Sequence, residues 1–543
     1  MLVGLLVVLA FSSALPLWRL ISRGLNPEAL AWLGDSTLAF RALANTLRTS
    51  AAVSVLATAT GALLAVFLGR YRVPGKGMLR LLILLPLVVP PHILALAWLS
   101  WLGPRGHFSR FIAWVTGAEQ VPWTLYGEGG IVLLLTVFAV PVAYLTISAG
   151  LSRLPRNLED SAQLEGATPW QVTRFMTLPL LRPHLLAGMM LAFLAAAGNF
   201  GITALLGIPG RFNTLPTLIY QRVTSFASGG LGHAAAISLL LVVVAAAALL
   251  AQFFLNRRNS EVDAQLERRP PLPLGSGSRA LAAAIWITVG FAAIGPFIAL
   301  LLTSLSRAYG LPMEFASFDL RHYRFVLNEL PSFRAALQNS LVLATVSSVV
   351  AASVATMLGY VLLKLRRGGW LLQLLVDLPY ALPGIVFALG LMLAWLPSPI
   401  PGLRIYGTIW LLGIAYVGHY LAFALQPIQA AWRQLDSRLE EAAQLDGANL
   451  LQAIRWVLLP MMAPTVVVAT LLVFLSAVSE ISLSALLAGS GTETLGWLIF
   501  GLEQAGTGHA AAALSVVLLA MVGLVALLVW LVGRWTSRRL PAG

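Results

Sequence analysis

Long apolar stretches alternate with short polar ones along the whole chain. Twelve of these stretches are long enough, at roughly 20 residues, to cross the hydrocarbon core of a bilayer as a helix. They lie near residues 2–18, 45–69, 78–101, 128–149, 183–206, 232–255, 280–303, 338–363, 370–396, 406–431, 462–488 and 509–533. This pattern predicts an all-α polytopic membrane protein with about twelve transmembrane helices.

The composition of the chain favours the same class. Its 543 residues are 59% hydrophobic and 10% charged, whereas a soluble domain is about 25% charged. Such a chain has too little polar surface to cover a globule in water. The run at 2–18 is compatible with a signal peptide or with a first span. Because no small-residue cleavage site follows a charged start, we interpret this run as a span.

One long polar segment divides the chain into two halves. Residues 256–279, NRRNSEVDAQLERRPPLPLGSGSR, are rich in Pro, Gly, Ser and charge and predict a linker. We therefore expect a first repeat at 1–255, with its core at 40–255, and a second repeat at 280–543. Six spans in each half make two parallel six-helix repeats.

The two halves share one polar stretch of sequence. The first copy reads LEDSAQLEGATPWQVTRFMTLPLLRP and begins at Leu158. The second copy reads LEEAAQLDGANLLQAIRWVLLPMMAP and begins at Leu439. The offset between Gly166 and Gly447 is 281 residues, and the other matched positions keep it. An internal repeat of this kind indicates two copies of one functional element.

Each copy predicts a short helix, a tight glycine turn and a second helix. Gly166 and Gly447 end the first helix, where a left-handed residue costs least. Thr168 and Asn449 are good N-caps for the second helix. The alternative is a pair of surface helices that merely cover a bundle, but the repetition argues against it.

The distribution of Lys and Arg predicts the orientation of the chain. If the N-terminus is inside, 22 of the 35 basic residues fall in inner segments, as the positive-inside rule requires. This orientation places both polar copies, the linker and both termini in the cytoplasm. The net charge of +14 thus sets topology and needs no nucleic-acid partner.

The second copy resembles the EAA motif of ATP-binding-cassette importer permeases. It has Glu441-Ala442-Ala443, then Gly447, then Leu459-Pro460. The first copy has Asp160-Ser161-Ala162 in place of E-A-A and keeps the glycine and the Leu-Pro pair. In that family the segment is a cytoplasmic coupling helix that inserts into a cleft of the ATPase subunit. The resemblance implies ATPase-coupling roles for Glu159, Asp160, Ala162, Gly166, Ala167, Glu440, Glu441, Ala443, Gly447 and Ala448.

Three polar residues lie inside predicted spans. Asn199 and Glu480 occupy the same place in the two repeats, and Asp377 lies in LLVDLPYALPG. A carboxylate at membrane depth costs about 3 kcal/mol, so it usually faces a cavity, a partner or a pathway. We expect these residues to line the translocation pathway. The alternatives are interhelical hydrogen bonds that fix packing and, for Asp377, a salt bridge at the cytoplasmic end.

The chain has no motif for hydrolysing ATP or for holding a metal. It lacks G-x-x-x-x-G-K-[ST], it has no cysteine, and its histidines follow no metal-ligand spacing. We therefore expect no catalytic residue, no metal site and no cofactor bound by this chain, with ATP held by partner ATPase subunits. The chain itself is then not an enzyme.

The whole chain resembles a fused two-repeat permease of a binding-protein-dependent importer, most like the iron(III) permeases. The resemblance implies two copies of a cytoplasmic ATPase, a periplasmic binding protein that docks on 207–223 and 489–506, and the bacterial inner membrane. Importers of thiamine or of an organophosphonate have a similar plan and remain alternatives for the cargo. A more distant alternative is a secondary transporter driven by protons.

Overall fold

The computed structural model describes residues 2–154, 161–162, 164–225, 228–257, 275–307, 318–365, 368–436 and 438–539. Over these ranges the regular secondary structure is helical, apart from an isolated bridge between Ser306 and Phe318. The predicted all-α class is therefore confirmed.

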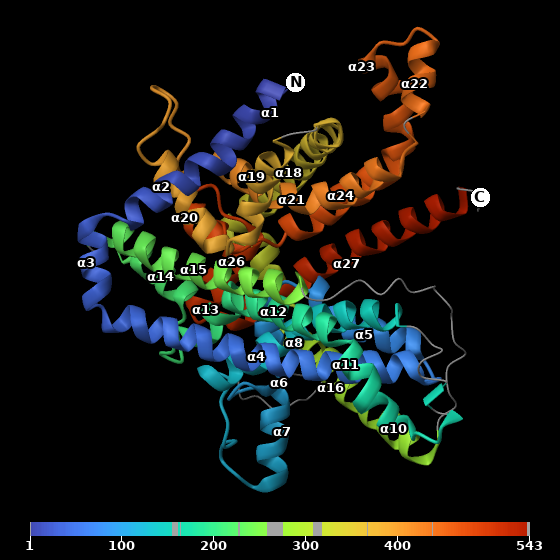
Figure 1. The fold of residues 1–543 in the computed structure, drawn as a ribbon. Coiled ribbons are helices and arrows are strands. Elements are labelled where there is room, and N and C mark those ends of the chain that lie inside the picture. The colour runs from blue at the N-terminus through green and yellow to red at the C-terminus, as the bar shows by residue number, and fades with distance from the viewer. Residues whose placement is uncertain are drawn as a thin grey trace. The chain divides into compact units, whose positions relative to one another are not determined.

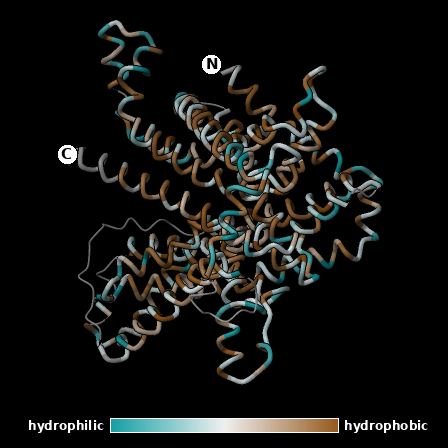
Figure 2. The backbone as a smooth tube through the Cα atoms, turned by 180° about the vertical axis from the view of Figure 1, so that it is seen from behind, coloured by the Kyte–Doolittle hydropathy of each residue, from teal (hydrophilic) through white to brown (hydrophobic). Residues whose placement is uncertain are grey.

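Long apolar helices dominate the described part of the chain (Figure 1). Nine are long and apolar enough to cross a membrane, or twelve if each of three bent pairs is one span. Figure 2 shows hydrophobic residues along these helices and hydrophilic residues near their ends. The long helices are the N-terminal stretch Gly4–Gly24, α4 (Thr37–Arg70), α8 (Glu128–Leu151), α15 (Gly230–Arg257), α16 (Ser276–Leu305), α18 (Pro331–Lys364), α21 (Ile409–Gln434), α24 (Leu459–Ala477, within Leu451–Ala477) and α27 (Gly508–Arg539).

Two predicted spans, 78–101 and 370–396, are sharply bent instead of continuous. The first divides into α5 (Lys76–Val88) and α6 (Pro91–Leu102), with a bend of 112°. The second divides into α19 (Gly369–Ala381) and α20 (Gly384–Trp395), with a bend of 111°. Pro90 and Pro383 are the residues before α6 and α20. Proline lacks the N–H that a continuous helix needs at this point and disfavours helical geometry in the residue before it.

Two further predicted spans, 183–206 and 462–488, end earlier than expected. The first consists of α12 (Arg182–Ala197) and then α13 (Gly201–Gly207). The second consists of α24, which ends at Ala477, and then α25 (Ser484–Leu487). Both interruptions contain the polar residue that the sequence placed inside a span, namely Asn199 and Glu480.

Shorter helices make up the N-terminal stretch or connect the long helices. They are α1 (Leu2–Leu9), η1 (Ala10–Ala14), α2 (Leu15–Gly24), α3 (Pro27–Asp35), α7 (His107–Thr116), α10 (Pro169–Val172), η2 (Thr173–Thr177), α11 (Leu178–Leu180), α14 (Leu215–Thr224), α17 (Arg321–Arg324), η4 (Phe325–Glu329), α22 (Arg438–Leu445), α23 (Leu450–Ala453), η5 (Ile454–Leu458) and α26 (Leu495–Gln504).

The chain forms two compact units, and each unit contains residues from both sequence repeats. Unit 1 contains Met1–Gly34, Ile219–Leu239 and Asp319–Gly543. Unit 2 contains Asp35–Leu218 and Leu240–Phe318. Each unit therefore includes the first long helix of the other sequence repeat. The boundaries predicted at residues 255 and 280 refer to the sequence repeat and stay a prediction.

In unit 1 the N-terminal helix packs against the second repeat. Ser13 donates a hydrogen bond of 2.6 Å to the Leu375 carbonyl. Gly390 lies so close to Pro16 that a Cβ atom would come within 3.0 Å of the Pro16 carbonyl oxygen. A glycine at this position allows α2 and α20 to approach closely.

In unit 2 helix α16 packs against α5 and α6 in the same manner. The Trp286 indole donates a hydrogen bond of 3.1 Å to the Pro74 carbonyl. Gly295 lies against Trp101, and a Cβ atom there would meet the indole ring at 2.8 Å. The first helix of each repeat is thus held by specific contacts within the unit that it joins.

Candidate functional site

The second polar copy folds as the predicted helix, glycine turn and helix. Helix α22 ends at Leu445, and Gly447 follows with φ of +86°. The Ala448 N–H donates to the Ala443 carbonyl at 3.0 Å and closes the turn. Asn449 then caps the second helix, because its Oδ1 accepts from the Gln452 N–H at 2.9 Å.

The first polar copy has the same geometry where the structure describes it. Gly166 has φ of +90°, and the Ala167 N–H donates to the Ala162 carbonyl at 2.9 Å. The Thr168 hydroxyl accepts from the Gln171 N–H at 3.3 Å. Glu159 and Asp160, which we expected to contact an ATPase, lie outside the described residues.

A one-residue widening of the helix follows each turn. The five-residue π-helices η2 and η5 occupy matching positions, 281 residues apart, just before Pro179 and Pro460. The extra residue lets the chain continue past a proline that cannot donate its own N–H. A helix usually stops before a proline, but here it continues through Pro179 into α11 and through Pro460 into α24.

Three large apolar side chains are exposed at matching positions of both copies. Sequence reasoning missed these residues, although an apolar side chain on a polar cytoplasmic helix is a readable signal. The pairs are Leu164 and Leu445, each 89% exposed, Trp170 (66%) and Leu451 (74%), and Phe175 (71%) and Trp456 (69%). The last pair also shares a cation–π contact. The Arg174 guanidinium carbon lies 5.5 Å from the centroid of the Phe175 ring, and that of Arg455 lies 5.1 Å from the centroid of the Trp456 ring. We call these six residues the apolar docking set.

The second copy is anchored to its own repeat through Glu440. Its carboxylate accepts a hydrogen bond of 2.9 Å from the Tyr360 hydroxyl and forms an ion pair of 2.8 Å with Lys364. Both partners lie at the end of α18. Tyr360 in turn packs edge-to-face on Trp432 of α21. Glu440 therefore connects α22 to two long helices, whereas Glu441 is exposed.

The first copy is anchored differently. Arg70, at the end of α4, donates to the hydroxyls of Thr173 and Thr177 in η2. This contact uses the second helix of the copy, whereas the Glu440 contact uses the first. Arg70 and Lys364 are matched positions at the ends of α4 and α18.

Asn199 and Glu480 have the same local role in the two repeats. The Asn199 side-chain oxygen accepts from the Ile202 N–H at 2.9 Å. The Glu480 carboxylate accepts from the Leu483 N–H at 2.9 Å. Each side chain caps the short helix that follows a broken span, which explains a polar residue at this depth.

Glu480 has additional partners that Asn199 lacks. The Tyr420 hydroxyl donates to its second oxygen at 2.6 Å, and the Tyr416 and Ser484 hydroxyls are 3.0 Å apart beside it. The corresponding residues of the first repeat are Ala139, Leu135 and Thr203. The polar cluster around Glu480 is therefore a feature of the second repeat.

Asp377 lies in a different environment from Glu480. Its carboxylate accepts from the Gln373 side-chain amide at 3.1 and 3.0 Å. Two basic residues, Lys364 and Arg366, were candidates for a salt bridge with Asp377. Lys364 pairs with Glu440 instead, and Arg366 lies outside the described residues. In the described part of the chain no three His, Asp or Glu side chains are placed to hold a metal ion.

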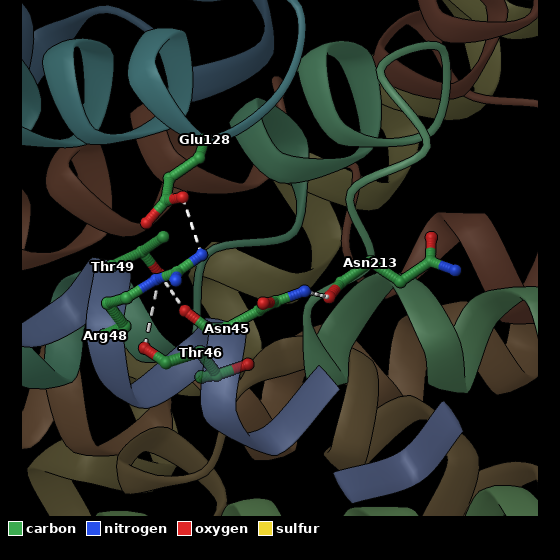
Figure 3. A network of polar contacts seen from close by, with 6 residues as sticks. All are labelled: Asn45, Thr46, Arg48, Thr49, Glu128 and Asn213. Atoms are coloured by element: carbon green, nitrogen blue, oxygen red, sulfur yellow. Dashed lines mark hydrogen bonds and ion pairs between the residues drawn. The ribbon is translucent and has the colours of Figure 1, made fainter. Parts of the chain in front are cut away.

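The segments that follow the broken spans are held by the start of a long helix. The Asn45 amide donates to the Asn213 carbonyl at 2.9 Å (Figure 3). Its neighbour Thr46 accepts from the Leu215 N–H. In the second repeat Asn339 donates to the carbonyls of Gly491 and Glu493 at 3.1 and 3.0 Å, and Ser340 accepts from the Leu495 N–H at 2.8 Å. Asn45 and Asn339 are matched positions, 294 residues apart, near the starts of α4 and α18. An ion pair of 2.6 Å between Arg48 and Glu128 adds to this contact in the first repeat (Figure 3).

A family model for the binding-protein-dependent transport system inner membrane component matches residues 57–261 and 347–541. The chain belongs to this family. The permease carries the family domain twice, so it is a fused two-repeat permease of the ATP-binding-cassette importer class, as its sequence predicted.

The permease is also similar to individual members of this class. A ferric transport system permease of Actinobacillus pleuropneumoniae is 23% identical, over 93% of this chain and 73% of the relative. An Fe(3+)-transport permease of Haemophilus influenzae is 25% identical, over 83% and 82%. A molybdenum transport permease of Escherichia coli is 30% identical, over 37% of this chain and 86% of the relative. The molybdenum relative therefore aligns with a length near that of one repeat.

Proposed function

We propose that this permease is the membrane subunit of an ATP-driven, binding-protein-dependent importer of ferric iron. Two copies of a cytoplasmic ATPase bind the two polar copies, one on each. The observation that carries this proposal is the apolar docking set, which repeats in size, position and exposure in both copies. Exposed apolar groups on otherwise polar helices are typical of protein interfaces.

The anchors of the two copies explain how force would enter the spans. The exposed Glu441, and Asp160 by analogy, would contact the ATPase. Glu440 faces the other way and joins α22 to Tyr360 and Lys364 of α18. A displacement of the second polar copy would then move α18, because the Glu440 contacts join the two directly. The left-handed turn at Gly447 fixes the angle between the two short helices.

Two observations favour ferric iron as the cargo. Relatives that cover 93% and 83% of the chain are named as ferric transport permeases, and another that covers 85% is named without a cargo. Glu480 also supplies a carboxylate in a broken span of the second repeat. A carboxylate attracts a hard cation and repels an oxyanion such as molybdate. Asn199, Glu480 and Asp377 are proposed to line the pathway, and thiamine or an organophosphonate remains the alternative cargo.

The remaining parts of the proposal concern partners and location. A periplasmic binding protein would dock on the outer segments at 207–223 and 489–506, which the Asn45 and Asn339 contacts hold in place. The permease would lie in a bacterial inner membrane with both termini in the cytoplasm. It would bind no cofactor of its own, and ATP would be bound by the ATPase subunits.

The test is uptake by the assembled importer in proteoliposomes. The permease, its ATPase and its binding protein are reconstituted, and ferric iron, molybdate and thiamine are offered with and without ATP. We expect ATP-dependent uptake of ferric iron alone. Uptake without ATP would instead support a secondary transporter, and ATP-dependent uptake of another cargo would correct only the substrate.

The ATPase contact has its own test. Leu164→Glu and Leu445→Glu each place a charge in the docking set, and both sites are 89% exposed, so the fold should tolerate them. We expect each variant to retain less ATPase subunit on purification, and the double variant to retain least. Leu403→Glu, in an exposed loop on the predicted outer side, is the control. Unchanged retention in the double variant would refute the docking role.

A further inference from the structure

Helix α7 carries an exposed apolar stripe that the transport function does not use. Phe111 is 54% exposed, Trp114 is 79% exposed and Val115 is 58% exposed. Their spacing of three and four residues places all three on one side of the helix. The segment 396–408, which joins α20 to α21 in the second repeat, has no corresponding helix. The stripe is therefore a feature of the first repeat.

The first turn of α7 is fixed to α16. His107 is buried and its Nε2 lies 3.1 Å from the Thr303 hydroxyl. The Phe108 ring packs on Phe291 of α16 at 5.1 Å and on Trp101 at 5.0 Å. His107 and Phe108 lie four and three residues before Phe111, so they share the side of the helix that carries the stripe, whereas Ser109 on the other side is buried. The stripe therefore continues the side of α7 that packs on α16 and is exposed beyond that contact. In Figure 1, α7 extends away from the long helix α4 and runs across its direction.

The contacts of α16 also indicate the depth at which α7 lies in the membrane. Near its start, α16 contacts Pro74 through Trp286, and Pro74 follows closely on Arg70, which holds the first polar copy. Thr303 is seventeen residues farther along α16, or about 25 Å at the rise of an α-helix. A bilayer core is about 30 Å thick. Helix α7 thus lies at the far boundary of the hydrocarbon from the coupling segment.

The stripe is continuous with the outward face of α16. Along that helix, exposed apolar residues recur at helical spacing: Ile287, Phe291, Ile294, Ile298 and Leu301. In a spanning helix this face contacts lipid. Phe291 belongs to it and also packs on α7, so the lipid-facing surface of α16 continues onto α7.

We propose that α7 lies in the outer interface of the bilayer, with Phe111, Trp114 and Val115 inserted at the boundary between headgroups and acyl chains. Amphipathic helices with Trp and Phe on one face bind membrane surfaces in this manner, and Trp is enriched at this depth. The occupant of the stripe is therefore phospholipid, not the binding protein. This proposal does not depend on the cargo.

The absence of cysteine in the chain makes a site-specific test simple. Trp114→Cys and Val115→Cys are labelled in turn with a fluorophore in the full-length permease, reconstituted in vesicles without the binding protein. Ile298→Cys, on the exposed face of α16, is the lipid control, and Glu119→Cys, in the exposed loop after α7, is the water control. Both α7 sites are mostly exposed, so the native packing should be kept.

We expect the labels at 114 and 115 to be several-fold less accessible to aqueous iodide than the label at 119. We also expect a nitroxide on the lipid headgroup to quench them more than a nitroxide deep in the acyl chain, the reverse of the order at 298. Iodide access equal to that at 119 would overturn the proposal. Protection that arises only after the binding protein is added would overturn it too, because the stripe would then be a protein-docking surface.

Discussion

The two repeats of the permease are nearly identical in their polar copies and differ in their broken spans. In the polar copies the glycine turns, the π-helices and the apolar docking set all match at an offset of 281 residues. In the broken spans one repeat has Asn199 with Ala139 and Leu135 at the two matching positions, and the other has Glu480 with Tyr420 and Tyr416. The contrast follows from what each region must contact. Under the proposed function, two copies of one ATPase would need two equal sites, whereas a single cargo would pass one pathway and need no such symmetry.

The contacts that anchor the polar copies match in position but differ in chemistry. Both repeats tie the copy to the end of a long helix, at Arg70 and at Lys364. The residues that receive the contact differ, with two threonine hydroxyls in one repeat and the Glu440 carboxylate in the other. The position of the anchor is therefore kept while its chemistry varies.

The largest effect is expected from Gly447→Pro. Proline fixes φ near −65°, whereas this residue has φ of +86° and donates its N–H to the Gln444 carbonyl at 3.0 Å. We expect complete loss of cargo-stimulated ATP hydrolysis by the assembled importer, with the permease still inserted. Gly166→Pro should have the same effect, because its φ is +90°.

Gly402→Pro is the matched control. Gly402 is also left-handed, with φ of +82°, but lies in the loop between α20 and α21. It should leave the stimulation of ATP hydrolysis close to normal. Normal stimulation in Gly447→Pro would remove the coupling role from the second copy, and a defect in only one of the two variants would show that the sites are unequal.

The next effect is expected from Glu440→Gln. This change removes the ion pair with Lys364 and weakens the contact with Tyr360, worth about 1 kcal/mol for a partly exposed pair. We expect stimulation of ATP hydrolysis to fall roughly fivefold while the ATPase subunit is retained. Glu441→Gln should do the reverse and lower retention, because Glu441 is exposed.

A charge exchange sharpens this prediction. Glu440→Lys combined with Lys364→Glu restores the pair with its charges reversed, and should recover stimulation relative to either single variant. If the double variant is no better than the singles, the pair does not transmit force. Loss of the ATPase subunit in Glu440→Gln would also contradict the anchor role.

Some features of the fold and of the polar copies could be predicted from the sequence, and others could not. Helix positions and the two glycine turns follow from local patterns, since an apolar run must be helical in lipid and a left-handed turn favours glycine. The role of Glu440 could not be predicted, because its partners on α18 are about 80 residues away in sequence. The size of the bends at Pro90 and Pro383 could not be predicted, because an apolar run such as 78–101 shows that a segment is buried in lipid but not how far a proline turns it. The exposure of Leu445 was readable, because it is an apolar residue on a short helix that is otherwise mostly polar.

A smaller effect on transport is expected when Glu480 loses its charge, which makes the broken span of the second repeat more like that of the first. Glu480→Gln keeps an oxygen that can cap the Leu483 N–H and removes the negative charge. We expect uptake of ferric iron to fall about tenfold, equivalent to 1.4 kcal/mol, with little change in thermal stability. Asn199→Ala should instead lower stability by about 1 kcal/mol through loss of a cap. Unchanged uptake in Glu480→Gln would assign Glu480 to packing alone.

The smallest effect is expected at the matched amides Asn45 and Asn339. Replacing either by Ala removes hydrogen bonds that hold an outer segment, each worth about 1 kcal/mol. Asn339 donates to two carbonyls and Asn45 to one, so Asn339→Ala should lower the melting temperature of the detergent-solubilised permease more than Asn45→Ala does. The ion pair between Arg48 and Glu128, which adds a second contact in the first repeat, should widen this difference. The reverse order of melting temperatures would mean that the outer segments are held mainly by packing and that the resemblance between the two amides is not a shared function.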